Sequence, residues 1–106
     1  MARTRLPITE KQFSQQVVDL ASLLGWVAYR TWTSIHSPKG FPDLVLVRER
    51  VVFVELKNDV GKVWPTQEAW LERLRSAGAE VYLWRPQDFE SLTEILRDSL
   101  AARGKE

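Results

Sequence analysis

The sequence predicts an α/β fold in which a mixed four-stranded sheet is flanked by helices. Runs of β-branched and aromatic residues alternate with segments of helical apolar spacing, in the order helix, strand, strand, strand, helix, strand, helix. Strands joined by a short loop pair antiparallel, whereas a strand-helix-strand connection usually gives a parallel pair. We expect one domain over residues 1–106, with a flexible arm at 1–7 and a frayed tail at 101–106.

The first helix has clear signals at both ends. Thr9 is a good N-cap, and Gln12 three residues later completes a capping box. Gly25 predicts a left-handed end to the helix. The apolar residues between them have helical spacing: Phe13, Val17, Leu20, Ala21 and Leu24. Residues 26–32 (WVAYRTW) then predict a strand, followed by a loop over 33–41.

Residues 43–47 and 51–57 predict two strands joined at residues 48–50. A three-residue loop would pair Val47 with Val51 and place Asp43 opposite Glu55 on one face, because opposed residues of a hairpin share a face. Lys57 lies two residues after Glu55 and shares that face. The other face of the second strand is wholly apolar, so we expect a central strand whose polar end opens into a cleft.

The second half of the chain continues the pattern. Residues 58–64 predict a turn, and Pro65 suits the first position of a helix. That helix has an apolar stripe closed by Gly78, with Gln67 as its one polar member. Residues 80–84 (EVYLW) predict a strand, and a last helix is expected to open at Pro86 or Asp88.

Composition excludes several classes of site and partner. The chain has no cysteine and one histidine, so disulfides and a His/Cys zinc site are excluded. It has no apolar run of about 18 residues, so we expect no membrane partner and a cytoplasmic setting. A net charge of +1 argues against a strongly basic, nonspecific nucleic-acid binder.

The charged residues inside the predicted hairpin suggest a metal site. Asp43 and Glu55 on adjacent strands could hold Mg²⁺ or Mn²⁺ through hard oxygen ligands, and the backbone carbonyl of Leu56 could add another. Lys57 could orient an attacking water or offset charge in a transition state. The alternative is a Glu55–Lys57 surface pair on an edge strand, with Asp43 as a turn residue.

The same residues carry a resemblance. Pro42-Asp43, a gap of eleven residues and Glu55-Leu56-Lys57 together resemble the PD-(D/E)xK nuclease pattern. A wider set resembles the VRR-NUC family, in particular its short, stand-alone, phage-type members, and the likeness spans about residues 9–97. That set comprises Glu10 at a helix start, GFPD at 40–43, ELK at 55–57, Gly61-Lys62, and Gln67 opening a helix.

This resemblance implies a restriction-endonuclease-like fold and Mg²⁺- or Mn²⁺-dependent hydrolysis of phosphodiester bonds, with a preference for flap, branched or four-way DNA. Carried over, Asp43 and Glu55 become metal ligands, Lys57 the catalytic lysine, Glu10 a helix-borne acid and Gln67 an accessory glutamine. Glu10 could instead be a first-turn acid favoured by the helix dipole, and Gln67 could cap its helix. A non-catalytic nucleic-acid- or protein-binding module on the same fold is the alternative function.

Candidate DNA contacts are less specific. Arg30, His36, Lys39 and Lys62 could contact phosphate or be solvated loop residues. The family pattern often has a histidine near position 30, and the arginine here leaves the role of His36 open. For Trp32 and Trp64 we expect core packing, with stacking on bases or on a partner subunit as the alternative. A homodimer is expected, since a symmetric pair suits a two-fold substrate.

Overall fold

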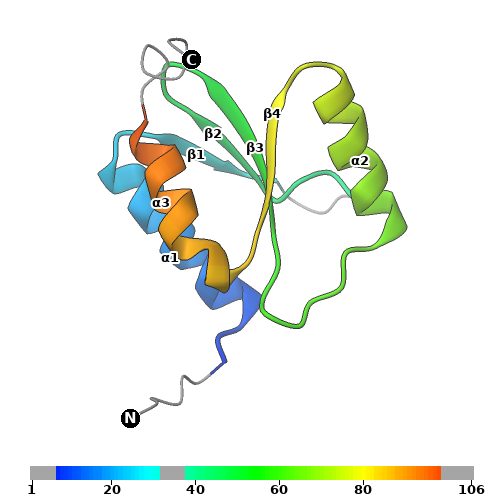
Figure 1. Cartoon of the computed structure of the whole chain (residues 1–106), viewed down its shortest axis with the longest axis horizontal. Helices are drawn as coiled ribbons and strands as arrows, with labels where there is room; N and C mark the ends of the chain where they lie inside the picture. The colour runs from blue at the N-terminus through cyan, green and yellow to red at the C-terminus, as the bar shows by residue number, and fades with distance from the viewer. Residues whose placement is uncertain (1–6, 32–37, 99–106) are drawn as a thin grey trace.

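The structure of the protein is a computed structural model that describes residues 7–31 and 38–98. His36 and Trp32, the expected tail at 101–106, and all but the last residue of the expected arm lie outside these ranges. The elements follow the predicted order (Figure 1): α1 (Glu10–Leu23), β1 (Val27–Arg30), β2 (Leu44–Val47), β3 (Val51–Leu56), α2 (Pro65–Ser76), β4 (Glu80–Trp84), a 3₁₀ turn (Pro86–Asp88) and α3 (Phe89–Arg97).

The four strands form one mixed sheet in the order β1-β2-β3-β4. β2 pairs antiparallel with both β1 and β3, whereas β4 runs parallel to β3 after the α2 crossover. Val47 pairs with Val51 and Val45 with Phe53, so the three-residue loop at 48–50 and its register are confirmed. β3 is therefore a central strand, as the apolar pattern predicted.

Helices cover both faces of the sheet. α1 and α3 lie side by side against one face, and α2 lies against the other (Figure 1). The main core fills the first interface with residues that are fully or almost fully buried: Phe13, Val17, Ala21, Trp26, Leu44, Leu46, Val52, Val54, Leu56, Trp84, Leu92 and Leu96. In the described part of the chain, no helix combines the length and apolarity required to cross a membrane.

Local signals place most element ends correctly. Thr9 and Gln12 exchange the two bonds of a capping box, at 2.9 and 3.0 Å, and Gly25 has a φ of +93°. β1 begins one residue later than predicted because Trp26 belongs to the end of α1: its backbone N–H donates to Ala21. Both predicted starts of the last helix are used, since a 3₁₀ turn opens at Pro86 and α3 follows it.

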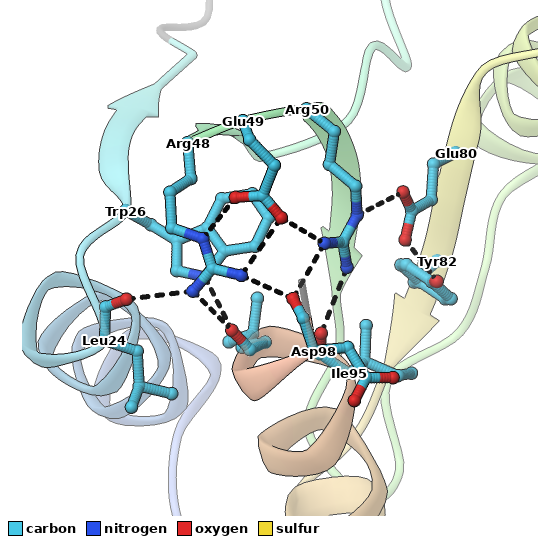
Figure 2. Close-up of polar contacts among 10 residues, drawn as sticks. Leu24, Trp26, Arg48, Glu49, Arg50, Glu80, Tyr82, Ile95 and Asp98 are labelled. Carbon is cyan, nitrogen blue, oxygen red and sulfur yellow. Dashed lines mark hydrogen bonds and ion pairs between the residues drawn. The ribbon is translucent and has the colours of Figure 1, made fainter. Parts of the chain in front are cut away.

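The turn between β2 and β3 ties both core helices to the sheet. Its two arginine side chains, which we call the arginine clamp, lie over the ring of Trp26, with Arg48 at 4.5 Å and Arg50 at 5.1 Å (Figure 2). They donate hydrogen bonds to carbonyl oxygens at the ends of α1 and α3, those of Leu24, Ile95, Leu96 and Asp98. Arg50 also pairs with Glu80 at 2.7 Å. Cations at helix C-termini are favourable, so the clamp stabilises this end of the fold.

Candidate active site

The turn at residues 40–43 delivers Asp43 to the end of the sheet opposite the arginine clamp. Gly40 has a φ of +99°, and a Cβ added there would lie 2.5 Å from the carbonyl oxygen of Thr66 in the first turn of α2. Phe41 packs edge-on against Trp70 of α2, with ring centroids 5.1 Å apart. The turn therefore sits directly against α2, and only glycine fits at its first position.

Asp43 is held through both its backbone and its side chain. Its carbonyl oxygen accepts a hydrogen bond from the Thr31 N–H at 3.0 Å. Its Oδ2 accepts one from the Leu56 N–H at 2.9 Å. Because Leu56 directly follows Glu55 in β3, the Asp43 carboxylate is fixed beside the end of that strand, as the hairpin register predicted.

Glu55 and Lys57 form a buried pair at the end of β3. Glu55 is 1% exposed and Lys57 is 6% exposed, and the Lys57 ammonium lies 3.8 Å from Glu55 Oε2. The Lys57 N–H also donates to the carbonyl oxygen of Trp84, which fixes the lysine at the strand end. The alternative of a surface pair on an edge strand is wrong, because the strand is central and both side chains are buried.

The electrostatics of Glu55 are unusual for a carboxyl group. Burial first, and then the negative charge of Asp43, raise its pKa to about 8, while Lys57 lowers it. Within the described residues, Glu55 Oε1 is buried and has no hydrogen-bond partner. Buried carboxylate oxygens normally have a hydrogen-bond partner, so an unpaired oxygen within a cluster of acids indicates a position where a cation could bind.

Gln67 connects the start of α2 to this cluster. Its side-chain Nε2 donates to Glu55 Oε2 at 2.8 Å, and its Oε1 accepts from the Trp64 backbone N–H at 2.9 Å. One side chain therefore both caps the start of α2 and contacts Glu55. The bond to Trp64 fixes the amide so that it presents its N–H to the carboxylate.

Glu10 reaches the site from the start of α1. It shares a cavity of about 330 Å³ with Asp43 and Leu56. Partial desolvation and the negative charge of Asp43 raise the pKa of Glu10, and Lys57 lowers it. An acid placed only to favour the helix dipole would not be coupled to these groups, so Glu10 belongs with the cluster.

Comparison with known proteins identifies the family. The model of the VRR-NUC domain matches residues 4–88. The chain belongs to the VRR-NUC domain family. Among curated proteins, none matches the sequence.

Solved structures show the fold of this VRR-NUC domain. A VRR-NUC domain protein superimposes with a TM-score of 0.71 at 15% identity over 87% of this chain and 88% of that one. A second VRR-NUC domain gives 0.69 at 27% identity over 82% and 97%. Hjc, a Holliday junction resolvase from Archaeoglobus fulgidus, gives 0.53 at 26% identity over 71% and 67%. The fold is restriction-endonuclease-like, and family and fold together place the chain among nuclease domains.

The candidate DNA contacts of the VRR-NUC domain are distributed unevenly. Arg30 lines the same cavity as Glu10 and is held by α1 through Ser14 Oγ at 2.8 Å and Gln15 Oε1 at 2.9 Å. Lys39 and Lys62 are exposed and do not line that cavity. His36 lies outside the described residues.

Sequence patterns did not single out Lys11, Ser14 or Thr31, which also line the cavity. A signal was present for Ser14, because position 14 lies one helical turn after Glu10 and on the same face of α1. Lys11 adds a second cation beside the acids. The cavity therefore combines carboxylates with basic side chains, a mixture suited to a phosphate held near a metal ion.

The donor set fits a hard divalent cation. In the parts of the chain that the structure describes, there is no group of three or more His, Cys, Asp or Glu side chains arranged to hold a metal ion. Two carboxylates and a backbone carbonyl need no third acidic side chain, since Mg²⁺ usually keeps several waters. The unpaired Glu55 Oε1 supports the fit.

Proposed function

We propose that this VRR-NUC domain is a divalent-metal-dependent endonuclease that hydrolyses phosphodiester bonds in DNA, with a preference for flap, branched or four-way structures. The buried Glu55 carboxyl carries the proposal, because it combines an unpaired oxygen with an ammonium at 3.8 Å and a second carboxylate beside the same strand end. Burying ionisable side chains costs free energy, so such groups cluster at sites that bind a ligand or carry out a reaction. The similarity to a Holliday junction resolvase supports a branched substrate.

Each side chain takes a distinct role in this proposal. Asp43, Glu55 and the Leu56 carbonyl would hold Mg²⁺ or Mn²⁺, which supplies a more acidic bound water and stabilises charge on the phosphate. Lys57 orients the attacking water or offsets charge in the transition state. Gln67 fixes Glu55 in place, and Glu10 faces the cavity that the water would enter.

The proposal extends to how DNA is held. Arg30, Lys39 and Lys62, together with His36, would contact phosphates, because such groups position the duplex without reading its sequence. A homodimer would match a two-fold four-way junction. Sedimentation that shows only the monomer mass, both alone and with DNA, would contradict the dimer. We place the activity in the cytoplasm of a bacterial or phage-infected cell.

Cleavage assays test the proposal directly. Labelled single-stranded, duplex, flap and four-way DNA are incubated with Mg²⁺ or Mn²⁺ and the wild-type, Asp43→Ala, Lys57→Ala and Glu90→Ala proteins. The two site variants should lose at least about 100-fold in rate. Glu90→Ala removes an exposed acid on α3 and should cleave like the wild type. Equal cleavage by all four proteins would refute the site.

The alternative function, a non-catalytic binding module, predicts a different result. Such a module would bind DNA or protein with equal affinity whether or not metal is added, and no product would form from any substrate. The buried acids and lysine favour the enzyme, because a binding module has no use for a buried carboxyl group with one oxygen near an ammonium and the other oxygen unpaired.

A further inference from the structure

We propose that the β3–α2 loop, residues 57–64, is a stacking platform for one unpaired base of the DNA substrate. The ring of Trp64 would receive the base, and Lys62 would contact the adjoining phosphate. This inference deepens the proposed function, on which it rests, by giving a physical origin for a preference for branched DNA.

The platform is exposed where the sequence predicted burial. Trp64 was expected in the core, yet 56% of it is open to solvent, whereas Trp26 and Trp84 are each 3% exposed. Val60 on the same loop is 88% exposed. The physical reason is that Trp64 is the N-cap residue of α2: its backbone carbonyl accepts the first hydrogen bonds of the helix, while its side chain lies outside the core. An exposed indole on an ordered loop is a strong candidate for contact with a ligand.

The loop is anchored to the candidate active site near both ends. The Trp64 backbone N–H donates to Gln67 Oε1, and the Nε2 of the same Gln67 side chain donates to Glu55. Gly61 lies against Lys57, since a Cβ added at Gly61 would sit 3.3 Å from Lys57 Cδ. The backbone of Trp64 is therefore held two hydrogen bonds from Glu55, which places the start of its side chain close to the proposed chemistry.

The first half of the loop is also ordered. Asn58 Oδ1 accepts from the Val60 N–H at 3.2 Å, as in an Asx turn, and the Asn58 carbonyl oxygen accepts from Arg85 Nη1 at 2.7 Å. The Gly61 N–H donates to the same carbonyl oxygen. An ordered loop loses little conformational entropy on binding, so it can contribute to affinity.

The pairing of a cation with an aromatic ring identifies the ligand as a nucleotide. The Lys62 ammonium lies 5.6 Å from the centroid of the Trp64 ring, and both side chains are exposed. A base can stack on an indole while its phosphate meets an ammonium. Bases inside a continuous duplex are stacked on both neighbours, whereas a single-stranded flap or a gap presents unpaired bases whose faces are free to stack on an indole.

Binding without cleavage tests the platform. The affinities for a fluorescein-labelled blunt duplex and for the same duplex with a single-stranded flap are measured in EDTA. Trp64→Ala should weaken flap binding about 10- to 100-fold while changing duplex binding little. The substitution keeps the backbone bond to Gln67, so the site remains intact. Trp64→Phe should retain most of the preference for the flap.

A matched control removes a different exposed aromatic ring. Tyr29 is 61% exposed on β1 and alternates with Arg30, so it faces away from the cavity that Arg30 lines. Tyr29→Ala should bind both DNAs like the wild type. Lys62→Ala should weaken binding to both DNAs and reduce the salt dependence of the affinity by about one counterion.

A second measurement reports the stacking itself. With 2-aminopurine as the first unpaired base of the flap, wild-type protein should quench its fluorescence and Trp64→Ala should not. No quenching by the wild type, or an unchanged flap preference in Trp64→Ala, would overturn the platform. So would a change in oligomeric mass caused by Trp64→Ala, since that would make the indole a contact with a second copy. Loss of cleavage alone bears on the proposed function and leaves these binding readouts unaffected.

Discussion

Replacing Gly40 by alanine should separate two costs that usually occur together. At a φ of +99°, any side chain costs about 1–2 kcal/mol of backbone strain. The added Cβ would also lie 2.5 Å from the Thr66 carbonyl oxygen and 2.6 Å from its carbon, both of which are backbone atoms of α2. Overpacking of this kind costs about 1–3 kcal/mol more. We therefore expect Gly40→Ala to lower the free energy of unfolding by roughly 2–5 kcal/mol.

Gly78 is a matched control for this experiment. Its φ is +93°, almost the same as that of Gly40, but a Cβ added there meets nothing within 4 Å. Gly78→Ala should therefore show the strain alone, and the effect of alanine on the unfolded chain is common to both variants. Urea unfolding followed by circular dichroism gives both values. If the two variants differ by less than about 0.5 kcal/mol, the inferred contact between the turn and α2 is wrong.

Three further outcomes can be checked on the same protein. Arg50→Ala should lower the free energy of unfolding by about 3–5 kcal/mol in urea, because the Arg50 side chain is 7% exposed and its loss leaves Glu80 without that partner. Arg75→Ala, which removes an exposed ion pair with Glu72, should lower it by only about 0–1 kcal/mol. Because the pKa of Glu55 is raised from 4.5 to about 8, this group stabilises the metal-free protein fully below about pH 4.5, and that contribution is lost as the pH rises through about 8, by up to about 1.4 kcal/mol per pH unit. Glu55→Gln should flatten this pH dependence in thermal unfolding. An equal pH dependence in the variant would contradict the burial of a neutral carboxyl group at position 55. Arg30→Ala should weaken binding to flap and duplex DNA alike and reduce the salt slope by about one in fluorescence anisotropy, while an unchanged slope would remove Arg30 from the phosphate contacts.

Much of the framework follows from local sequence. The capping box at Thr9, the glycine at position 25 and the proline at position 65 act over a few residues, so their effects can be predicted without the fold. The position of Asp43 opposite the end of β3 also follows from one local quantity, the length of the loop at 48–50. Alternating side chains on paired strands convert that length into a geometry.

The features that sequence did not reveal depend on distant contacts. From the sequence, Arg48 and Arg50 are ordinary polar residues of a turn. Their hydrogen bonds to carbonyl oxygens at the ends of α1 and α3 depend on how these two helices pack against the turn. The exposure of Trp64 contradicted the expectation of core burial, because amino-acid type alone favours burying an indole. Lys11 lines the cavity because the start of α1 lies beside Asp43 and Leu56, and the apolar pattern of α1 does not encode that neighbourhood.

The arginine clamp has a consequence for how the molecule opens. It fastens the β2–β3 turn to the ends of α1 and α3, whereas the start of α1 and the last residues of β3 lie at the opposite end of the sheet (Figure 1). Hydrogen exchange should thus be slowest near the clamp and faster around residues 57–64, where few backbone amides pair with neighbouring strands. Local openings should therefore begin at the end of the sheet that carries the candidate active site and leave the clamp end closed.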